Sequence, residues 1–257
     1  MNPRVVVCTP TKNRRWTWEF SQECMKRQLL QPVQWIVVDN SSDPEQDWSP
    51  STANPLVRYV SVPEPRPIGW LRNRSLDLAL EANPDYIVFW DDDDYYPPTR
   101  ISTGVKALEA NPTADIAASS KMHILLVREN VMMVTGPFHD THGTAATQTV
   151  RASYARTHRF NPEKARGEEL DFTMSWTAKL IQVNSEETIV VMGHGRNTVD
   201  KSDILVRPKV YNSVILNSDN GKMLFRTRWP VPWGLWQSTF SGVGCVSLRD
   251  CTPPGPV

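Results

Sequence analysis

The sequence has few glycines and no glycine-rich phosphate loop. Of its 257 residues 12 are glycine, and neither the GxxxxGK(S/T) pattern nor the GxGxxG pattern occurs. Such loops hold phosphate groups through backbone amides. If this protein binds a nucleotide, we therefore expect a metal ion and basic side chains to hold the phosphates.

Net charge, paired cysteines and long apolar runs are also absent. Lys+Arg and Asp+Glu both number 28, which argues against a protein that mainly binds nucleic acid. The four cysteines form no CxxC pair, and Cys8 lies in an apolar run, which predicts a buried free thiol. No run approaches the roughly 18 apolar residues of a membrane span, and the N-terminus lacks the apolar core of a secretory signal. We expect a cytoplasmic protein without a membrane span.

Apolar strands alternate with amphipathic helices through the first half of the chain. The predicted strands are residues 4–9, 33–40, 56–62, 86–90, 114–119, 123–127 and 187–192. The predicted helices are residues 16–30, 67–82, 99–110 and 168–181. Residues 136–166 have weak periodicity, which predicts irregular structure with short strands. The alternation predicts an α/β fold with a mixed, mostly parallel central sheet flanked by helices.

Polar residues stand where several predicted strands end. Thr9 and Asp39 follow two strands, and four aspartates follow the strand in "YIVFWDDDDYYPP", residues 86–98. Ligands of parallel sheets bind beyond the carboxyl ends of the strands. A carboxylate cluster is costly unless a cation neutralises it, and Mg²⁺ or Mn²⁺ prefers oxygen ligands. The run predicts a metal–diphosphate site, and a solvated acidic turn is the alternative.

Five segments occur along the chain: VVVCTPTKNRR, WIVVDNSSD, GWLRNRSLDLAL, YIVFWDDDDYYPP and ARGEELDF. In this order and spacing, over residues 4–197, they resemble the family-2 glycosyltransferases of the GT-A fold. The resemblance implies a metal-dependent, inverting enzyme that moves a hexose from a UDP-sugar, of the UDP-glucose or UDP-rhamnose type, to a glycan hydroxyl. The opening segment is also similar to glycosyltransferases of large algal viruses, which would place the protein in the host cytoplasm.

The resemblance implies residues for the nucleotide-sugar donor. The turn after the first strand holds the uridine in this family, and Asp39 stands where the family binds uracil. Arg72 corresponds to an arginine near the base and the phosphates, while Arg74 is a second helix charge. Asp91 and Asp92 would lie against the ribose and the sugar. The implied donor-binding residues are Thr9, Pro10, Thr11, Lys12, Arg14, Asp39, Gly69, Arg72, Asp91 and Asp92.

The resemblance also implies the metal ligands and the catalytic base. Asp93 would bind Mn²⁺ or Mg²⁺, and Asp94 would cap the following turn. His194, between two glycines, would be an exposed imidazole on a mobile loop that reaches the metal. Glu169 stands in place of the catalytic base, which takes the proton of the acceptor hydroxyl, and Glu168 is the alternative.

The character of the sequence changes from about residue 212, and we divide the chain there. Residues 1–211 would form the GT-A domain, with a nucleotide-binding half to about residue 120 and an acceptor half over about 121–211. Residues 212–257 form a Trp- and Pro-rich tail, which we interpret as a lid or the start of a further domain. Trp176 and the tail tryptophans are candidates for packing on the acceptor sugar, and packing in the protein core is the alternative.

Other interpretations of the same residues stay open. The two helix arginines are also explained as solvated charges, the acidic residues 168–171 as an ordinary helix start, and a single histidine as structural. At the level of function, a catalytically degenerate GT-A domain that binds nucleotide or glycan is one alternative. A nucleotidyltransferase is another, although it usually carries a glycine-rich basic loop after the first strand.

Overall fold

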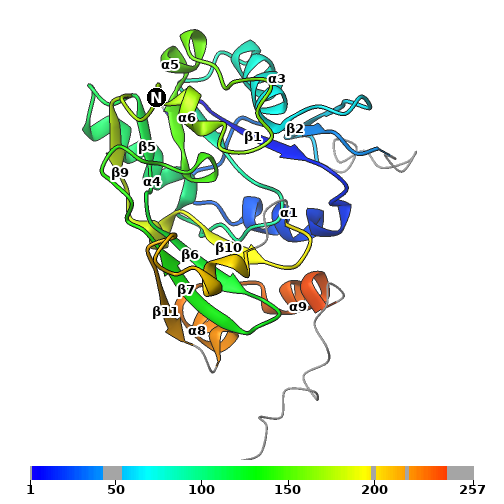
Figure 1. The fold of residues 1–257 in the computed structure, drawn as a ribbon. Helices are drawn as coiled ribbons and strands as arrows, with labels where there is room; N and C mark the ends of the chain where they lie inside the picture. The colour runs from blue at the N-terminus through cyan, green and yellow to red at the C-terminus, as the bar shows by residue number, and fades with distance from the viewer. Residues whose placement is uncertain (1, 43–53, 198–200, 218–219, 242–257) are drawn as a thin grey trace, which may run out of the picture.

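The computed structural model describes residues 2–42, 54–197, 201–217 and 220–241, which form two sheets flanked by helices (Figure 1). The strands are β1 (Val5–Thr11), β2 (Gln34–Asp39), β3 (Val57–Ser61), β4 (Tyr86–Phe89), β5 (Ile116–Ala118), β6 (Met122–Leu126), β7 (Val131–Thr135), β8 (Thr149–Arg151), β9 (Leu180–Gln182), β10 (Val190–Gly193) and β11 (Ser213–Asn217). The α-helices are α1 (Trp18–Lys26), α3 (Ile68–Glu81), α4 (Arg100–Ala110), α5 (Ala152–Thr157), α6 (Glu169–Phe172), α7 (Asp203–Val206), α8 (Gly221–Arg228) and α9 (Trp233–Ser241). Short 3-10 helices are η1 (Arg15–Thr17), η2 (Ala145–Thr147) and η3 (Ser185–Glu187).

The larger sheet is mixed and mostly parallel, as predicted. Its seven strands have the order β3-β2-β1-β4-β8-β5-β9. β1 pairs in parallel with β2 and β4, β2 with β3, and β5 with β9, whereas β8 runs antiparallel to β4 and β5. The carboxyl ends of β1, β2 and β4 therefore meet at one edge of the sheet.

Both faces of this sheet are buried. Side chains alternate along a strand, so Val5 and Val7 of β1 belong to one apolar cluster and Val6 and Cys8 to the other. Residues of α1, α4 and the second sheet complete the first cluster, and residues of α3 and α5 complete the second (Figure 1). Burial on both faces explains the uninterrupted apolar runs in the sequence. Cys8 is buried and free, as predicted.

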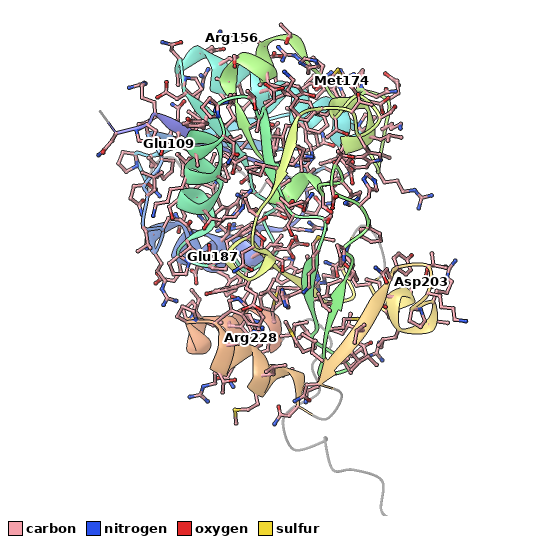
Figure 2. All side chains as sticks on the ribbon, turned by 90° about the vertical axis from the view of Figure 1, so that its left-hand side faces the viewer. Glu109, Arg156, Met174, Glu187, Asp203 and Arg228 are labelled. Carbon is pink, nitrogen blue, oxygen red and sulfur yellow. The ribbon has the colours of Figure 1, made fainter. Side chains whose placement is uncertain are left out.

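The second sheet carries four strands in the order β10-β6-β7-β11. β11 comes from the predicted tail and pairs antiparallel with β7. The α8 helix covers this sheet, and Trp229 Nε1 donates a hydrogen bond to the Glu186 carbonyl at 3.0 Å. Figure 2 shows Arg228 of α8 below Glu187 of η3. The remaining tail, residues 242–257, with Cys245 and Cys251, lies outside the described residues.

The predicted helix over residues 168–181 is wrong beyond its first turn. α6 ends at Phe172, and Met174, Ser175 and Trp176 have φ angles of 51°, 55° and 66°. Three left-handed residues in succession cannot continue a right-handed helix. The last apolar residues of the segment instead form β9, which pairs in parallel with β5. Pairing of these residues with β5 at the edge of the sheet is therefore favoured over the helix that the local sequence pattern predicts.

The segment over residues 136–166 is more regular than its sequence predicts. It contains η2, β8 and α5, and β8 completes the sheet between β4 and β5. Tyr154 and Ala155 of α5 are buried against α3 and the sheet. No helix among the described residues is long and apolar enough to cross a membrane.

Candidate functional site

The carboxyl ends of β1, β2 and β4 bring most of the predicted site residues together. Thr11 is the register partner of Asp39, and the four aspartates follow directly after β4 and Trp90. The arrangement follows from parallel pairing, because strands that run in the same direction end at the same edge.

Arg14 joins two of the aspartates. Its Nη1 lies 3.0 Å from Asp92 Oδ1 and 2.9 Å from Asp93 Oδ2, and Thr11 Oγ1 donates a further hydrogen bond to Asp92. Burial raises the pKa of Asp92 to about 7, although Arg14 opposes this shift. Burial also acts to raise the pKa of Asp93, but the hydrogen bond from His194 and the charge of Arg14 bring it below its ordinary value. The pKa values of the two neighbouring carboxyls are therefore shifted in opposite directions.

His194 is buried, which corrects the expectation of an exposed imidazole. The residue is 1% exposed, and its Nε2 donates to Asp93 Oδ2 at 3.0 Å. The Trp16 ring packs edge-on against the imidazole, with 5.1 Å between ring centroids. Asn197 Nδ2 donates to Asp93 at 3.3 Å and to the Met192 carbonyl at 3.0 Å. These contacts fix the loop after β10 against the aspartate run, so the two flanking glycines do not leave the imidazole in solvent.

Asp94 does not cap the following turn as predicted. Its Oδ1 accepts a hydrogen bond from the backbone N–H of Met192 in β10 at 2.8 Å. Burial, together with the charges of Asp93 and Asp91, raises the pKa of Asp94 well above its ordinary value. The residue thus ties the aspartate run to the second sheet, a role that depends on a contact between residues 98 positions apart.

Arg72 connects the aspartate run to the predicted base region. Its Nη2 lies 3.2 Å from Asp91 Oδ1, and its Nε donates to Glu168 Oε1 at 2.7 Å. Within the described residues, Nη1 of Arg72 is buried without a hydrogen-bond partner. Arg74, two residues further along α3, lines none of the cavities described below. The two helix arginines therefore differ in environment.

The neighbouring glutamates also differ. The Glu168 side chain is 7% exposed and paired with Arg72. Glu169 begins α6 and lines a cavity together with Asp91 and Arg72. Burial and the charge of Glu168 raise the pKa of Glu169. A raised pKa makes a carboxyl a better proton acceptor than an ordinary glutamate.

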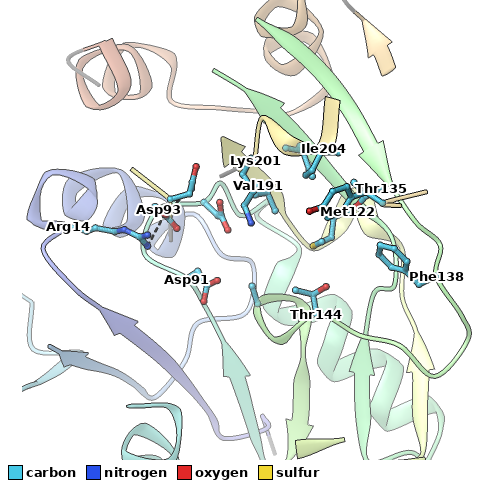
Figure 3. A pocket seen from close by; sticks show the side chains of 15 residues that line it. Arg14, Asp91, Asp93, Met122, Thr135, Phe138, Thr144, Val191, Lys201 and Ile204 are labelled. Carbon is cyan, nitrogen blue, oxygen red and sulfur yellow. Dashed lines mark hydrogen bonds and ion pairs between the residues drawn. The ribbon is translucent and has the colours of Figure 1, made fainter. Parts of the chain in front are cut away.

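Three adjoining cavities lie along this edge, and Arg14 lines all of them. The first, of about 420 Å³, lies between the turn after β1, with Lys12, and the start of α3. The second, of about 240 Å³, is lined by Arg72, Asp91, Asp92 and both glutamates. The third, of about 250 Å³, lies between the aspartates and the second sheet (Figure 3).

Three predicted donor residues lie outside these cavities. Thr9 is 1% exposed, and its Oγ1 accepts a hydrogen bond from Trp35 Nε1 at 2.9 Å. Asp39 is 2% exposed, with Oδ1 accepting from Ser41 and Oδ2 from Tyr59. Gly69 packs against a loop, since a Cβ atom there would lie 2.0 Å from the Asn161 carbonyl oxygen.

The predictions missed several residues that line the cavities or fix the aspartates. Asn197 holds Asp93, while Thr144 and Ala146 form a wall that the second and third cavities share. The polar segment after β10 was a signal for Asn197. Nothing in the sequence singles out a threonine and an alanine from the irregular segment before β8, because their position depends on the tertiary fold.

The metal donors are few in the structure. Across the described residues, no group of three or more His, Cys, Asp or Glu side chains is arranged to hold a metal ion. Asp93 and His194 supply one carboxylate and one imidazole. Mg²⁺ and Mn²⁺ sites that also bind substrate phosphates often have only one or two protein carboxylates, so Asp93 fits such an ion. His194 Nε2 donates to Asp93 and Nδ1 accepts from the Arg196 N–H, so the imidazole must give up one of these hydrogen bonds to be a second ligand.

The sheet order, the aspartate run at its carboxyl edge and the cavities beside it define a GT-A domain. Residues 6–166 match the family described as glycosyl transferase family 2, and the chain belongs to that family. It therefore carries a glycosyltransferase domain. No curated protein is similar enough in sequence to count as a match.

Solved structures share the fold. TarS 1–349 of S. aureus in complex with UDP-GlcNAc is 18% identical, with a TM-score of 0.57 over 77% of this chain and 60% of that one. The mannosyltransferase PcManGT of Pyrobaculum calidifontis, in complex with GDP-Man and Mn²⁺, is 18% identical, with a TM-score of 0.53 over 77% of this chain and 59% of that one. The chain thus spans about 60% of the length of these proteins.

Proposed function

We propose that the protein transfers a hexose from a UDP-sugar, of the UDP-glucose or UDP-rhamnose type, to a glycan hydroxyl with inversion at the anomeric carbon. The observation that carries the proposal is the contrast between the two glutamates. Both glutamates line the same cavity as Asp91 and Asp92, but Arg72 holds Glu168 in an ion pair, whereas Glu169 makes no ion pair among the described residues. An inverting transfer requires one such carboxylate beside the donor.

The donor is proposed to lie across the first two cavities. The nucleoside occupies the larger one, between the turn Pro10–Arg14 and the start of α3, where Arg66 and Arg196 also stand. The diphosphate and the sugar extend into the second cavity. There the unpaired Nη1 of Arg72 is a donor for a phosphate or sugar oxygen. A nucleotide-sugar of this class accords with the family and with the UDP-GlcNAc and GDP-Man complexes of the neighbours.

The reaction is a single displacement. The acceptor oxygen forms a bond to the anomeric carbon while the bond from that carbon to the diphosphate oxygen breaks, and UDP leaves. Glu169 takes the proton of the acceptor hydroxyl, and its raised pKa makes it a stronger base than an ordinary glutamate. Arg14, which is partly exposed, and Arg72, which is buried, are both cationic and stabilise the growing negative charge on the diphosphate.

A divalent cation, Mn²⁺ or Mg²⁺, is proposed as the cofactor, held by Asp93 and His194. When bound, such an ion stabilises the charge that develops on the leaving diphosphate. The buried hydrogen bond between the two side chains, at 3.0 Å, already fixes them next to each other.

We propose that the first half of the GT-A domain binds the nucleotide and that the second half binds the acceptor. Residues to about 120 contribute most of the nucleotide cavity, and residues of about 121–211 contribute the second sheet on the acceptor side. The described part of the tail, residues 212–217 and 220–241, supports that sheet. The glycan acceptor is developed in the next subsection.

Thermal unfolding with UDP, with and without Mn²⁺, tests the donor site, because a ligand that binds only the folded protein raises its melting temperature. We expect UDP to stabilise the protein, and Mn²⁺ to increase the effect. Arg72→Lys should weaken the stabilisation, since lysine lacks the guanidinium fork. Arg74→Lys on the same helix is the matched control and should leave it unchanged.

Release of UDP, GDP or dTDP from a panel of nucleotide sugars, with glycan acceptors present, then tests turnover. Release of UDP only from UDP-hexoses is the expected result. UDP binding without turnover of any donor would favour the degenerate, binding-only domain. No stabilisation by UDP with metal, together with stabilisation by GDP, would overturn the choice of nucleotide.

A further inference from the structure

The third cavity changes character along its length. One end carries Asp91, Asp93 and Arg14, next to the second cavity. The other end lies between β6, β7 and α7, where Figure 3 shows Met122, Thr135 and Ile204 gathered. A ligand that fills this cavity therefore meets charged groups at one end and apolar groups at the other.

The apolar end contains one hydroxyl that the fold does not satisfy. Thr135 is 2% exposed, and among the described residues its Oγ1 has no hydrogen-bond partner. Buried polar groups are nearly always paired, so an exception needs an explanation. A ligand oxygen in the cavity would supply the missing partner.

The cavity adjoins the proposed reaction centre. Asp91, Thr144, Ala146 and Lys201 line both this cavity and the one that contains Glu169. A molecule seated here therefore adjoins the cavity of Glu169, whereas among the described residues this cavity shares only Arg14 with the nucleotide cavity. In-line displacement requires an acceptor to approach from the side opposite the leaving diphosphate.

We propose that this cavity binds the acceptor, and that the acceptor ends in a neutral 6-deoxyhexose. The inference rests on the proposed function and names its second substrate. The methyl group at C6 lies against Met122, Ile204 and Phe138, a ring oxygen or hydroxyl accepts from or donates to Thr135, and the reactive hydroxyl points toward Glu169.

Size and charge support this class of ligand. A volume of about 250 Å³ is just below the roughly 300–1,000 Å³ of sites for drug-sized ligands, so one sugar ring is a suitable occupant. An apolar wall favours a methyl group over a hydroxymethyl group, because burying an unpaired hydroxyl is costly. A carboxylate at C6 would lie against the same apolar wall, where burying a charge without a partner is costly.

Methyl glycosides matched at every position but C6 test the proposal. Sets in the gluco, galacto and manno configurations carry CH₃, CH₂OH or COO⁻ at C6, and their dissociation constants are measured by ligand-observed NMR with and without UDP and Mn²⁺. An octyl glycoside is also tested. It shows whether the apolar wall binds the methyl group at C6 of the sugar or an apolar aglycone. In the best configuration we expect the 6-deoxy sugar to bind about tenfold or more tightly than the hexose, and the uronate to bind most weakly.

Variants of the cavity wall locate the binding. Thr135→Val keeps the shape but removes the hydroxyl, and Ile204→Ala removes apolar contact. Each should weaken binding of the 6-deoxy glycoside about tenfold, while the thermal shift with UDP stays unchanged. Val206→Ala, on the same helix but at a residue that is 77% exposed, is the matched control and should bind as the wild type does.

Four results would overturn the proposal. The uronate could bind as tightly as the 6-deoxy sugar, or the octyl hexoside could bind more tightly than the 6-deoxy glycoside. Ile204→Ala and Val206→Ala could weaken binding equally. Finally, no glycoside could bind although UDP still stabilises the protein. Loss of the UDP effect in the wild type would count against the donor site alone, because the glycosides are also measured without UDP.

Discussion

Replacing each of the adjacent glutamates by glutamine separates the proton acceptor from the residue that positions its neighbours. Glu169→Gln removes a carboxylate that lines the second cavity, where the sugar of the donor is proposed to lie. Glu168→Gln instead weakens the ion pair to Arg72, whose atoms lie 2.7 Å apart and whose side chains are 5% and 7% exposed. The two substitutions are chemically identical, so any difference reflects position.

The structure sets the expected magnitudes. Glu169→Gln should lower kcat by about 10²–10⁴, the usual contribution of a general base, with little change in the donor KM. Glu168→Gln leaves a buried charge with a neutral partner, which costs about 1–3 kcal/mol. For a chain of this size that cost lowers the melting temperature by about 2–12 °C.

The pH dependence of activity independently tests the direction in which the pKa of Glu169 is shifted. Burial and then the charge of Glu168 raise the pKa of Glu169. A base must be ionised to act, so activity falls as the pH drops through that pKa. In Glu168→Gln the second cause is removed, and the acid limb of kcat/KM should move to lower pH. Burial remains, so the pKa stays above that of an ordinary glutamate.

Initial rates of UDP release, with melting temperatures of the same preparations, provide the assay. Full turnover by Glu169→Gln would refute its role as the base, and Glu168 and Asp171 would be tested next. An acid limb that moves to higher pH in Glu168→Gln would refute the electrostatic reasoning.

Three further predictions concern the metal, acid stability and backbone packing. Asp93→Ala should abolish the additional stabilisation by Mn²⁺ in thermal unfolding with UDP, and an unchanged Mn²⁺ effect would exclude Asp93 as a ligand. Burial lowers the pKa of His123 from 6.5 to about 4, so the unfolded chain binds more protons than the folded one between these values, and stability falls as the pH drops through them. From the size of this pKa shift, the loss in the free energy of unfolding is up to about 3 kcal/mol. His123→Phe should make the free energy of unfolding, measured by denaturant titration, depend less on pH in this range. An unchanged pH dependence would contradict the prediction. Gly69→Ala should destabilise the protein by about 1–3 kcal/mol, because the new Cβ would meet the Asn161 carbonyl oxygen at 2.0 Å, and a wild-type melting temperature would show that the loop moves at no cost.

Local pattern was sufficient for the central strands and for the ends of α3. Pro67 precedes the helix with a φ of −65°, and Asn83, just before Pro84, has a left-handed φ of 46°. Such residues limit a helix through their own backbone geometry, whatever surrounds them. The segment over residues 168–181 shows the opposite case, because pairing of β9 with β5 depends on residues more than 60 positions earlier.

The sequence alone determined that a buried strand ends in four aspartates, and that a parallel sheet brings them to the edge where ligands bind. These properties depend on apolar periodicity and on strand direction, both of which are local. Only the tertiary structure decided which partner each aspartate has: Arg72 for Asp91, Arg14 for Asp92, His194 for Asp93 and the backbone of β10 for Asp94. Their partners come from segments up to about 100 residues away, so distance and burial, which set the charge of each carboxyl, exist only after the chain has folded.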